Sequence, residues 1–254
     1  MPLIKIVNLN LLFPKVLISC ILLLLTQALH AQEKQQTQVF IVGDSTASYY
    51  KANKYPRTGW GMRLQQHLAD TVTVHNLAVS GRSSRSFINE GYIYPIWEQI
   101  NAGDYLLIQF GHNDQKKDKD RNTLPFSSYQ FYLSYYINKA RELGAKPILL
   151  TSISRYKFDD NNKAIDTHKD YPVAMRQLAE KLNVPLIDLT VKTTELLNKL
   201  GPTKAKELFL FYQPGEYASY PKGVSDGTHL SEWGADQVVG LFVDDLKQLA
   251  PELF

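Results

Sequence analysis

The alternation of apolar and amphipathic segments constrains the fold of this chain more than any other feature of its sequence. Five short apolar runs have the length of buried strands: 38–42, 72–77, 105–110, 147–152 and 185–189. Amphipathic stretches separate them, and a long one, 231–250, closes the chain. Short apolar strands that alternate with helices form βαβ units, which build a parallel sheet covered on both faces. The sequence therefore predicts an α/β fold: a three-layer α/β/α sandwich around a central, mostly parallel five-stranded sheet.

The first 31 residues differ in character from the rest of the chain. Two lysines precede an apolar run of fourteen residues, which ends near "ALHA". This run is short of the roughly 20 apolar residues of a membrane-spanning helix, and the pattern is typical of a secretory signal peptide. We therefore expect cleavage after Ala31, a single domain over 32–254, and export to the periplasm or the extracellular space. A lipoprotein signal at Cys20 is disfavoured, because the apolar run continues beyond that cysteine.

Loss of residues 1–31 would leave 26 of the 28 basic residues against all 25 acidic ones, a net charge near +1. So small a charge argues against nucleic acid or an anionic membrane surface as a partner. We also expect no stable membrane association after signal cleavage. The only cysteine leaves with the signal peptide, so the mature chain has no disulfide, no thiolate metal site and no cysteine nucleophile.

The block "GDST" directly follows the first predicted strand. Its serine, Ser45, falls at the carboxyl edge of the sheet, where ligands of open α/β sheets bind. Taken alone, these residues fit the N-cap of a following helix better than a catalytic site.

Two further blocks offer hydrogen-bond donors after predicted strands. Gly81 follows the second strand, and a glycine lets its own backbone N–H approach a ligand closely. Asn113, in "GHND", follows the third strand, and its amide group is able to donate to an oxyanion. Each also has an ordinary interpretation, a turn before a helix for Gly81 and an Asx turn for Asn113.

The block "DGTH" precedes the last predicted helix, and we place it in a loop. There Asp226 is able to accept a hydrogen bond from one ring nitrogen of His229, which leaves the other nitrogen free to take a proton from Ser45. Capping of the helix does not require Asp226, because Thr228 or Ser231 could serve.

A metal site is the alternative for the same residues. Asp226, His229, His112 and Asp114 are ligand types that zinc or calcium accepts. No HExxH or similar spacing supports this, and it leaves the "GDST" block without a role. We therefore predict no metal and no cofactor.

The four blocks "GDST", "SGRSSRSF", "GHND" and "DGTHLSEWGA", in this order, resemble those of the SGNH/GDSL hydrolase family. They look most like the rhamnogalacturonan acetylesterase branch, and the resemblance runs from about residue 38 to 250. It implies the flavodoxin-like fold of SGNH hydrolases. It also implies a secreted serine esterase that removes O-acetyl groups from plant cell-wall polysaccharide, above all acetylated rhamnogalacturonan.

The resemblance also implies roles for particular residues. Ser45 would be the nucleophile, and Asp226 and His229 would complete the triad. The backbone N–H groups of Ser45 and Gly81 and the side chain of Asn113 would form the oxyanion hole. His112 competes with His229 as the base, but only His229 has an acid at the right spacing.

Substrate-binding residues are expected among the polar loops near these blocks. Arginine pairs bidentately with uronate carboxylates, and aromatic faces stack on sugars. The candidates are Arg57, Arg82 and Arg155, with Tyr55 and Trp60 as aromatic contacts. The alternative is that the arginines are solvated and the aromatic side chains pack in the core. His168 is expected at the surface.

Other functions remain open at this point. The chain could deacetylate xylan or another glycan, or hydrolyse a lipid ester or a thioester. A protein of a different class, a carbohydrate-binding module without catalysis, could have kept the fold. The expected partner is an acetylated polysaccharide or oligosaccharide.

Overall fold

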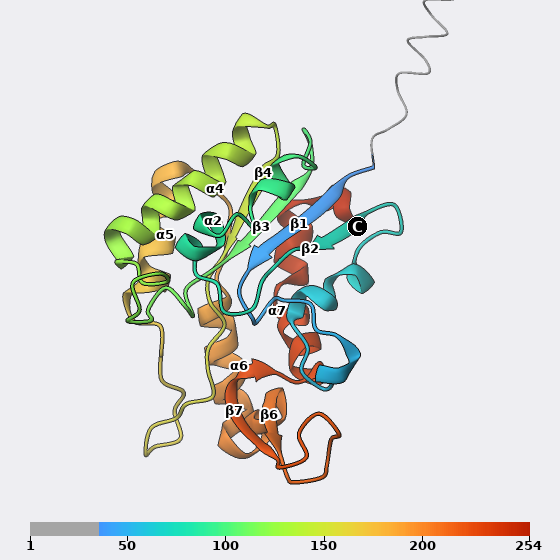
Figure 1. Cartoon of the computed structure of the whole chain (residues 1–254), viewed down its shortest axis with the longest axis vertical. Coiled ribbons are helices and arrows are strands. Elements are labelled where there is room, and N and C mark those ends of the chain that lie inside the picture. The colour runs from blue at the N-terminus through green and yellow to red at the C-terminus, as the bar shows by residue number, and fades with distance from the viewer. Residues whose placement is uncertain (1–35) are drawn as a thin grey trace, which may run out of the picture. The chain divides into compact units, whose positions relative to one another are not determined.

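A five-stranded sheet lies at the centre of the fold (Figure 1). The computed structural model describes residues 36–254, so the predicted signal peptide and Cys20 lie outside the described residues. The strands are β1 (Gln38–Gly43), β2 (Thr73–Asn76), β3 (Tyr105–Gln109), β4 (Lys146–Leu150) and β5 (Leu186–Ile187). They pair in the order β2-β1-β3-β4-β5, and every pair is parallel. The predicted parallel sheet is confirmed, and each predicted strand overlaps one of these.

Helices cover both faces of the sheet, as predicted. One layer contains α2 (Ser84–Asn89), α3 (Tyr94–Trp97), α4 (Gln130–Glu142) and α5 (Asp170–Leu182); the other contains α6 (Leu189–Ala205) and α7 (Glu232–Leu249). Strand β1 faces both layers: Phe40 and Val42 point to the first, and Val39 and Ile41 to the second. All four side chains are fully buried, which explains the unbroken apolar run in the sequence.

Short helical turns complete the structure. They are η2 (Ala52–Lys54), η3 (Trp60–Met62), η4 (Leu64–His67), η5 (Pro125–Tyr129), η6 (Lys206–Leu208) and η7 (Pro251–Leu253). No helix within residues 36–254 has the length and apolarity needed to cross a membrane.

The segment 59–69 is one of the amphipathic stretches between the predicted strands, yet it forms only η3 and η4. Two glycines, Gly59 and Gly61, lower its helix propensity by about 1 kcal/mol each. Both pack against backbone of the turn after β1, since a Cβ on Gly61 would lie 2.6 Å from the carbonyl oxygen of Ala47. Close packing therefore takes precedence over helical periodicity in this segment.

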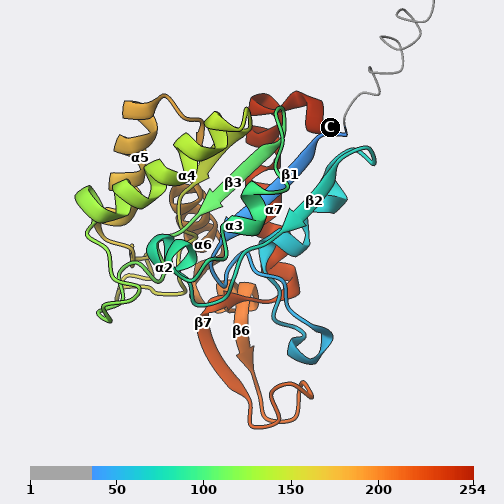
Figure 2. The ribbon, with the colours of Figure 1, turned by 45° about the horizontal axis from the view of Figure 1, so that its top comes forward.

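A two-stranded antiparallel hairpin, β6 (Phe209–Tyr212) and β7 (Val224–Leu230), was not predicted. It lies beyond the end of the sheet toward which β1 points (Figures 1 and 2). Asp226 and His229 therefore lie on a strand, and their expected placement in a loop is wrong. The reason is that β7, "VSDGTHL", has neither an apolar run nor the alternation of a half-buried strand, so its pairing depends on tertiary contacts.

The last helix begins where β7 ends, at a tightly packed junction. Ser231 caps α7 by accepting a hydrogen bond from the Gly234 N–H at 2.9 Å. A Cβ on Gly234 would overlap the carbonyl oxygen of Leu208, so only glycine fits there. Gly240, further along the same helix, is exposed and has open space around its Cβ position.

We predict that Gly234→Ala lowers the free energy of unfolding by about 1–3 kcal/mol, the usual cost of overpacking. Gly240→Ala is the matched control and should raise it by up to about 1 kcal/mol, because alanine is the better helix former. Urea unfolding of both variants measures the difference. Equal effects of the two substitutions would contradict the packing account of the junction.

Candidate active site

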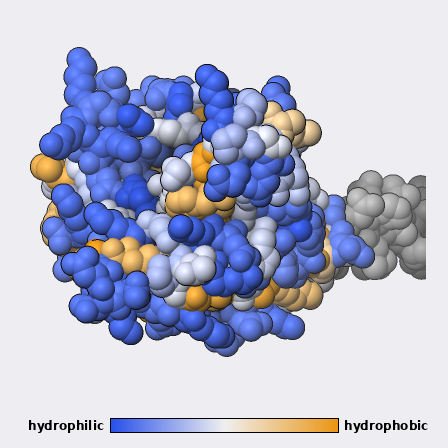
Figure 3. Space-filling view, turned by 90° about the horizontal axis from the view of Figure 1, so that it is seen from below, coloured by the Kyte–Doolittle hydropathy of each residue, from blue (hydrophilic) through white to orange (hydrophobic). Residues whose placement is uncertain are grey.

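The predicted site residues gather at the point where the strand order reverses. Strand β1 has β2 on one side and β3 on the other, and ligands of open α/β sheets bind at such a switch point. Ser45 follows β1, Gly81 follows β2, and Asn113 follows β3, while the hairpin brings β7 to the same edge. Figure 3 looks onto this end of the molecule and shows a hollow bordered by hydrophilic surface.

Three side chains form a continuous chain of hydrogen bonds. The Nε2 atom of His229 lies 3.0 Å from the Oγ of Ser45, and its Nδ1 lies 2.6 Å from the Oδ2 of Asp226. The other carboxylate oxygen of Asp226 accepts the backbone N–H groups of Thr228 at 2.8 Å and His229 at 3.1 Å. The structure thus brings together the nucleophile, base and acid that the sequence analysis predicted.

The charge of Asp226 fits this arrangement. Burial alone would raise the pKa of this carboxyl, but the hydrogen bond and the charge of His229 lower it, as do two backbone N–H groups, and the resulting pKa is about 2. Asp226 is therefore ionised at neutral pH. An ionised carboxylate on Nδ1 orients the imidazole ring and favours the tautomer whose Nε2 is free to accept a proton.

The three predicted oxyanion donors also lie at this edge. Among residues 36–254, the backbone N–H groups of Ser45 and Gly81 have no hydrogen-bond acceptor. Gly81 has a φ of 82°, a conformation that favours glycine. The Nδ2 of Asn113 donates one hydrogen to the carbonyl oxygen of Arg82 at 3.0 Å, which leaves its second hydrogen free and ties the Gly81 loop to the Asn113 loop.

Arg57 is linked to Ser45 through Tyr50. Its guanidinium stacks 4.4 Å from the ring centre of Tyr50, whose hydroxyl donates to the carbonyl oxygen of Ser45 at 2.6 Å. Its buried Nε has no partner within the described part of the chain. Tyr50 was not predicted as a site residue, and its only signal in the sequence is an aromatic residue five positions after Ser45.

The other substrate-binding candidates lie differently. Arg82 forms an ion pair with Glu90 at 2.6 Å, and Arg155 donates to the carbonyl oxygens of Thr167 and His112, both at 3.3 Å. Trp60 is fully buried, so its expected contact with substrate is wrong and the core interpretation holds.

Tyr55 is half exposed, in keeping with a contact surface. Its hydroxyl donates to Glu232 at 2.9 Å.

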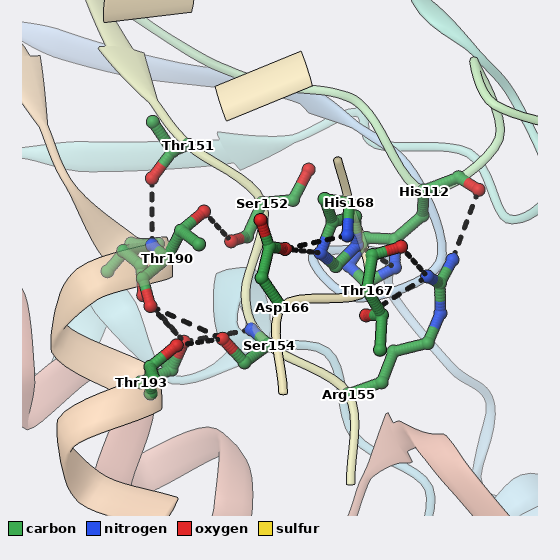
Figure 4. A network of polar contacts seen from close by, with 12 residues as sticks. His112, Thr151, Ser152, Ser154, Arg155, Asp166, Thr167, His168, Thr190 and Thr193 are labelled. Atoms are coloured by element: carbon green, nitrogen blue, oxygen red, sulfur yellow. Dashed lines mark hydrogen bonds and ion pairs between the residues drawn. The ribbon is translucent and has the colours of Figure 1, made fainter. Parts of the chain in front are cut away.

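Two buried histidines contact each other near this site: His112, which directly precedes Asn113 in the sequence, and His168 (Figure 4). The Nδ1 of His112 is 3.1 Å from the Nε2 of His168, and both side chains are almost fully enclosed. The expected surface position of His168 is therefore wrong. His168 precedes α5, so helical periodicity does not indicate which way its side chain points. The side chain is buried, and the backbone N–H of His168 donates to Asp166 at 2.7 Å.

The metal alternative finds no support in these positions. Asp114 accepts hydrogen bonds from the Ser84 hydroxyl at 2.5 Å and the Thr123 hydroxyl at 3.1 Å, and burial raises its pKa to about 7. His112 is bound to His168 and not to Asp226 or His229. Within residues 36–254, no three histidine or carboxylate side chains are grouped to hold a metal ion.

Comparison with known proteins adds to this geometry. Residues 41–237 match the model of the GDSL-like lipase/acylhydrolase family. The chain is similar to the rhamnogalacturonan acetylesterase RhgT of Bacillus subtilis, at 44% identity over 85% of this chain and 92% of the relative. It is also similar to YesY of the same organism, a probable rhamnogalacturonan acetylesterase, at 35% identity over 83% of this chain and 93% of that relative.

Solved structures share the fold. The Bacillus subtilis protein YxiM matches with a TM-score of 0.71 at 27% identity, over 87% of this chain and 58% of that one. The acetylxylan esterase Axe2 of Geobacillus stearothermophilus matches with a TM-score of 0.60 at 17% identity, over 83% of this chain and 94% of that one.

The buried histidine pair gives a testable pH dependence. Burial lowers the pKa of His168 to about 3, whereas the unfolded chain takes up this proton near 6.5. Between these values the unfolded state binds more protons, so His168 lowers stability as the pH falls. We predict that the unfolding free energy of His168→Asn, minus that of wild type, rises by about 2 kcal/mol when the pH is lowered from 7.5 to 4.5.

Unfolding must be compared between variant and wild type at each pH, because Asp44 and Asp114 act in the opposite sense. Burial raises their pKa values to about 6 and about 7, so each stabilises the folded state as the pH falls. The exposed His67 provides the control, His67→Asn. An equal gain in both variants would show that the effect does not come from the buried pair.

Proposed function

Since this chain belongs to the GDSL-like lipase/acylhydrolase family and is therefore a carboxylic ester hydrolase, we propose that it removes O-acetyl groups from acetylated rhamnogalacturonan. The observation that most directly supports a serine mechanism is the hydrogen-bonded chain Ser45–His229–Asp226. The choice of substrate is supported by the 44% identity to a rhamnogalacturonan acetylesterase over most of both chains. The proposal includes export by residues 1–31.

In the proposed mechanism, Ser45 attacks the acetyl carbonyl carbon while His229 takes the hydroxyl proton on Nε2. The negative charge that develops on the carbonyl oxygen is held by the N–H groups of Ser45 and Gly81 and the free hydrogen of Asn113 Nδ2. His229 then returns the proton to the departing sugar oxygen. His229 then takes a proton from water, whose oxygen attacks the acetyl carbon, and it returns this proton to the Oγ of Ser45 as the bond to the acetyl group breaks and acetate leaves. No step requires a metal or an organic cofactor.

Arg57 is the strongest candidate for binding a uronate carboxylate of the substrate. It is partly exposed and is linked to Ser45 through Tyr50, and no carboxylate of residues 36–254 neutralises its charge. Arg82 keeps a role at the rim, although Glu90 competes for it. Arg155 fits a positioning role, because it holds the backbone of His112, next to Asn113.

We predict that Ser45→Ala abolishes acetate release from acetylated rhamnogalacturonan while the unfolding free energy changes little. The matched control is Ser48→Ala, three residues later in the same turn, which loses a bond to the Asp44 carbonyl oxygen and should keep most of the activity. Acetate is measured enzymatically, with acetylated xylan alongside and a chelator control.

The outcomes of this assay separate the candidate functions. Acetate release from xylan alone that requires Ser45 would support the proposed mechanism but would show that the substrate is acetylated xylan. Activity that survives in Ser45→Ala would contradict the proposed nucleophile. No release from either polymer by wild type would favour a carbohydrate-binding protein on the same fold.

We also predict that Asp226→Asn lowers kcat by about 10³–10⁴-fold with little change in KM, because an amide no longer favours the reactive tautomer of His229. Asp159→Asn is the control, since Asp159 also accepts two backbone N–H groups, those of Asn161 and Lys163, but no imidazole. Steady-state kinetics on a soluble acetyl ester measure both. Unchanged turnover in Asp226→Asn would remove this residue from the triad.

A further inference from the structure

A second hollow, of about 400 Å³, lies between the hairpin and the turn that follows η2. Its walls include Tyr55, Phe211, Tyr212, Tyr217, Glu232 and Trp233, and none of the proposed triad residues lines it. Its volume falls within the range of about 300–1,000 Å³ that small-molecule sites occupy.

An aromatic ridge forms one side of this hollow. The rings of Tyr55 and Tyr217 meet edge to face at 6.0 Å, and Tyr212 lies 4.5 Å from Tyr217. On the other side of the ridge is a smaller hollow of about 280 Å³, which Tyr55 and Tyr217 also line. Tyr55 is exposed, and Tyr212 and Tyr217 are half-buried. Aromatic rings between two hollows provide flat apolar faces with polar tips, which suit the mixed surface of a sugar ring.

The residues that line the hollow carry three carboxylates, Glu207, Glu216 and Glu232, and one lysine, Lys206. Glu232 accepts the Tyr55 hydroxyl and pairs with Arg63 at 3.2 Å, and Glu207 pairs with Lys204 at 2.6 Å. Lys206 adds a further positive charge beside the aromatic wall. No arginine lines the hollow, in contrast to the surroundings of Ser45. The walls therefore offer hydrogen-bond donors and acceptors without the excess positive charge that a uronate requires.

The hollow is linked to the proposed triad through the backbone. The N–H of Thr58, just after the turn, donates to the carbonyl oxygen of Leu230 at 3.0 Å, and Leu230 follows His229 directly. Ser231, the next residue, lines the hollow. A ligand held here would therefore lie at a fixed position relative to His229.

From these observations we propose that the hollow binds an uncharged saccharide unit, at a site separate from the ester-hydrolysing site. The aromatic ridge stacks against the sugar ring, and Glu232 and the tyrosine hydroxyls bond its hydroxyl groups. The site extends the proposed function, because it would hold a neutral part of the polymer while the acetylated unit lies at Ser45. Binding itself does not depend on that function.

The test uses oligosaccharides without acetyl groups, so its result is independent of ester hydrolysis. Cellotetraose and galactotetraose serve as uncharged probes, and trigalacturonate serves as the charged probe. Saturation-transfer NMR detects binding, and calorimetric titration of the protein with each probe gives the Kd. We expect an uncharged probe to bind wild type, and Tyr217→Ala to weaken that binding at least fivefold. Tyr55→Ala, on the other half of the ridge, should give a similar loss.

The matched control is Tyr94→Ala, because Tyr94 is 55% exposed on α3 and does not line the hollow. It should bind the probe as wild type does. Failure of both uncharged probes to bind wild type would overturn the proposal, as would equal binding by wild type, Tyr217→Ala and Tyr55→Ala. Loss of trigalacturonate binding in the two ridge variants, without loss of the uncharged probe, would also overturn it.

Discussion

The hydrogen bond between His229 and Ser45 joins residues 184 positions apart, and the rest of the site depends on it. Ser45 is fixed by the central sheet, but the hairpin with His229 is not part of that sheet. Backbone hydrogen bonds from separate segments hold β7 instead: Thr58 to Leu230 at 3.0 Å, and Tyr156 to Gly227 at 2.7 Å. Since these bonds involve the backbone, they locate the imidazole without depending on mobile side chains. The hairpin thus places the imidazole of His229 within hydrogen-bond distance of Ser45.

The pKa shifts around the site distinguish one ionised carboxylate, that of Asp226, from its buried titratable neighbours. Burial raises the pKa of Asp44 to about 6 and that of Asp114 to about 7, and it lowers the pKa values of His112 and His168. Each shift favours the neutral form. Asp226 is the exception among these groups, because hydrogen bonds to its charged form outweigh its burial. Neighbouring groups whose pKa values shift in opposite directions take different acid and base roles in proteins. Here the low pKa of Asp226 keeps a negative charge beside His229 at neutral pH.

The sequence predicted the sheet well because its central strands, β1 and β3, are buried on both faces. Residues 39–42 are apolar without interruption, and the strand and the position of Ser45 after it follow from that alone. The predictions were wrong where tertiary contacts decide the structure. Strand β7 consists largely of polar residues and glycine, so its sequence does not indicate a strand. Segment 59–69 does not form a continuous helix, because Gly59 and Gly61 pack closely against the backbone after β1. His168 lies before a helix, where periodicity has no meaning, so neither its burial nor its bond to His112 was accessible from the sequence.

The roles of the arginines also depend on tertiary contacts that the sequence does not reveal. In the sequence, Arg57, Arg82 and Arg155 are equivalent candidates, because a guanidinium near the predicted site is able to pair with an acidic substrate from any of these positions. Their partners decide between them: Glu90 neutralises Arg82, and the carbonyl oxygen of His112, 43 residues away, accepts from Arg155. Arg57 instead lies on an aromatic ring that is itself bonded to the backbone of Ser45. Of these three arginines, Arg57 is therefore the one whose charge is left for a substrate. Under the two proposals, a polymer with charged and neutral units would place a charged unit at Arg57 and a neutral unit in the aromatic hollow, which no arginine lines.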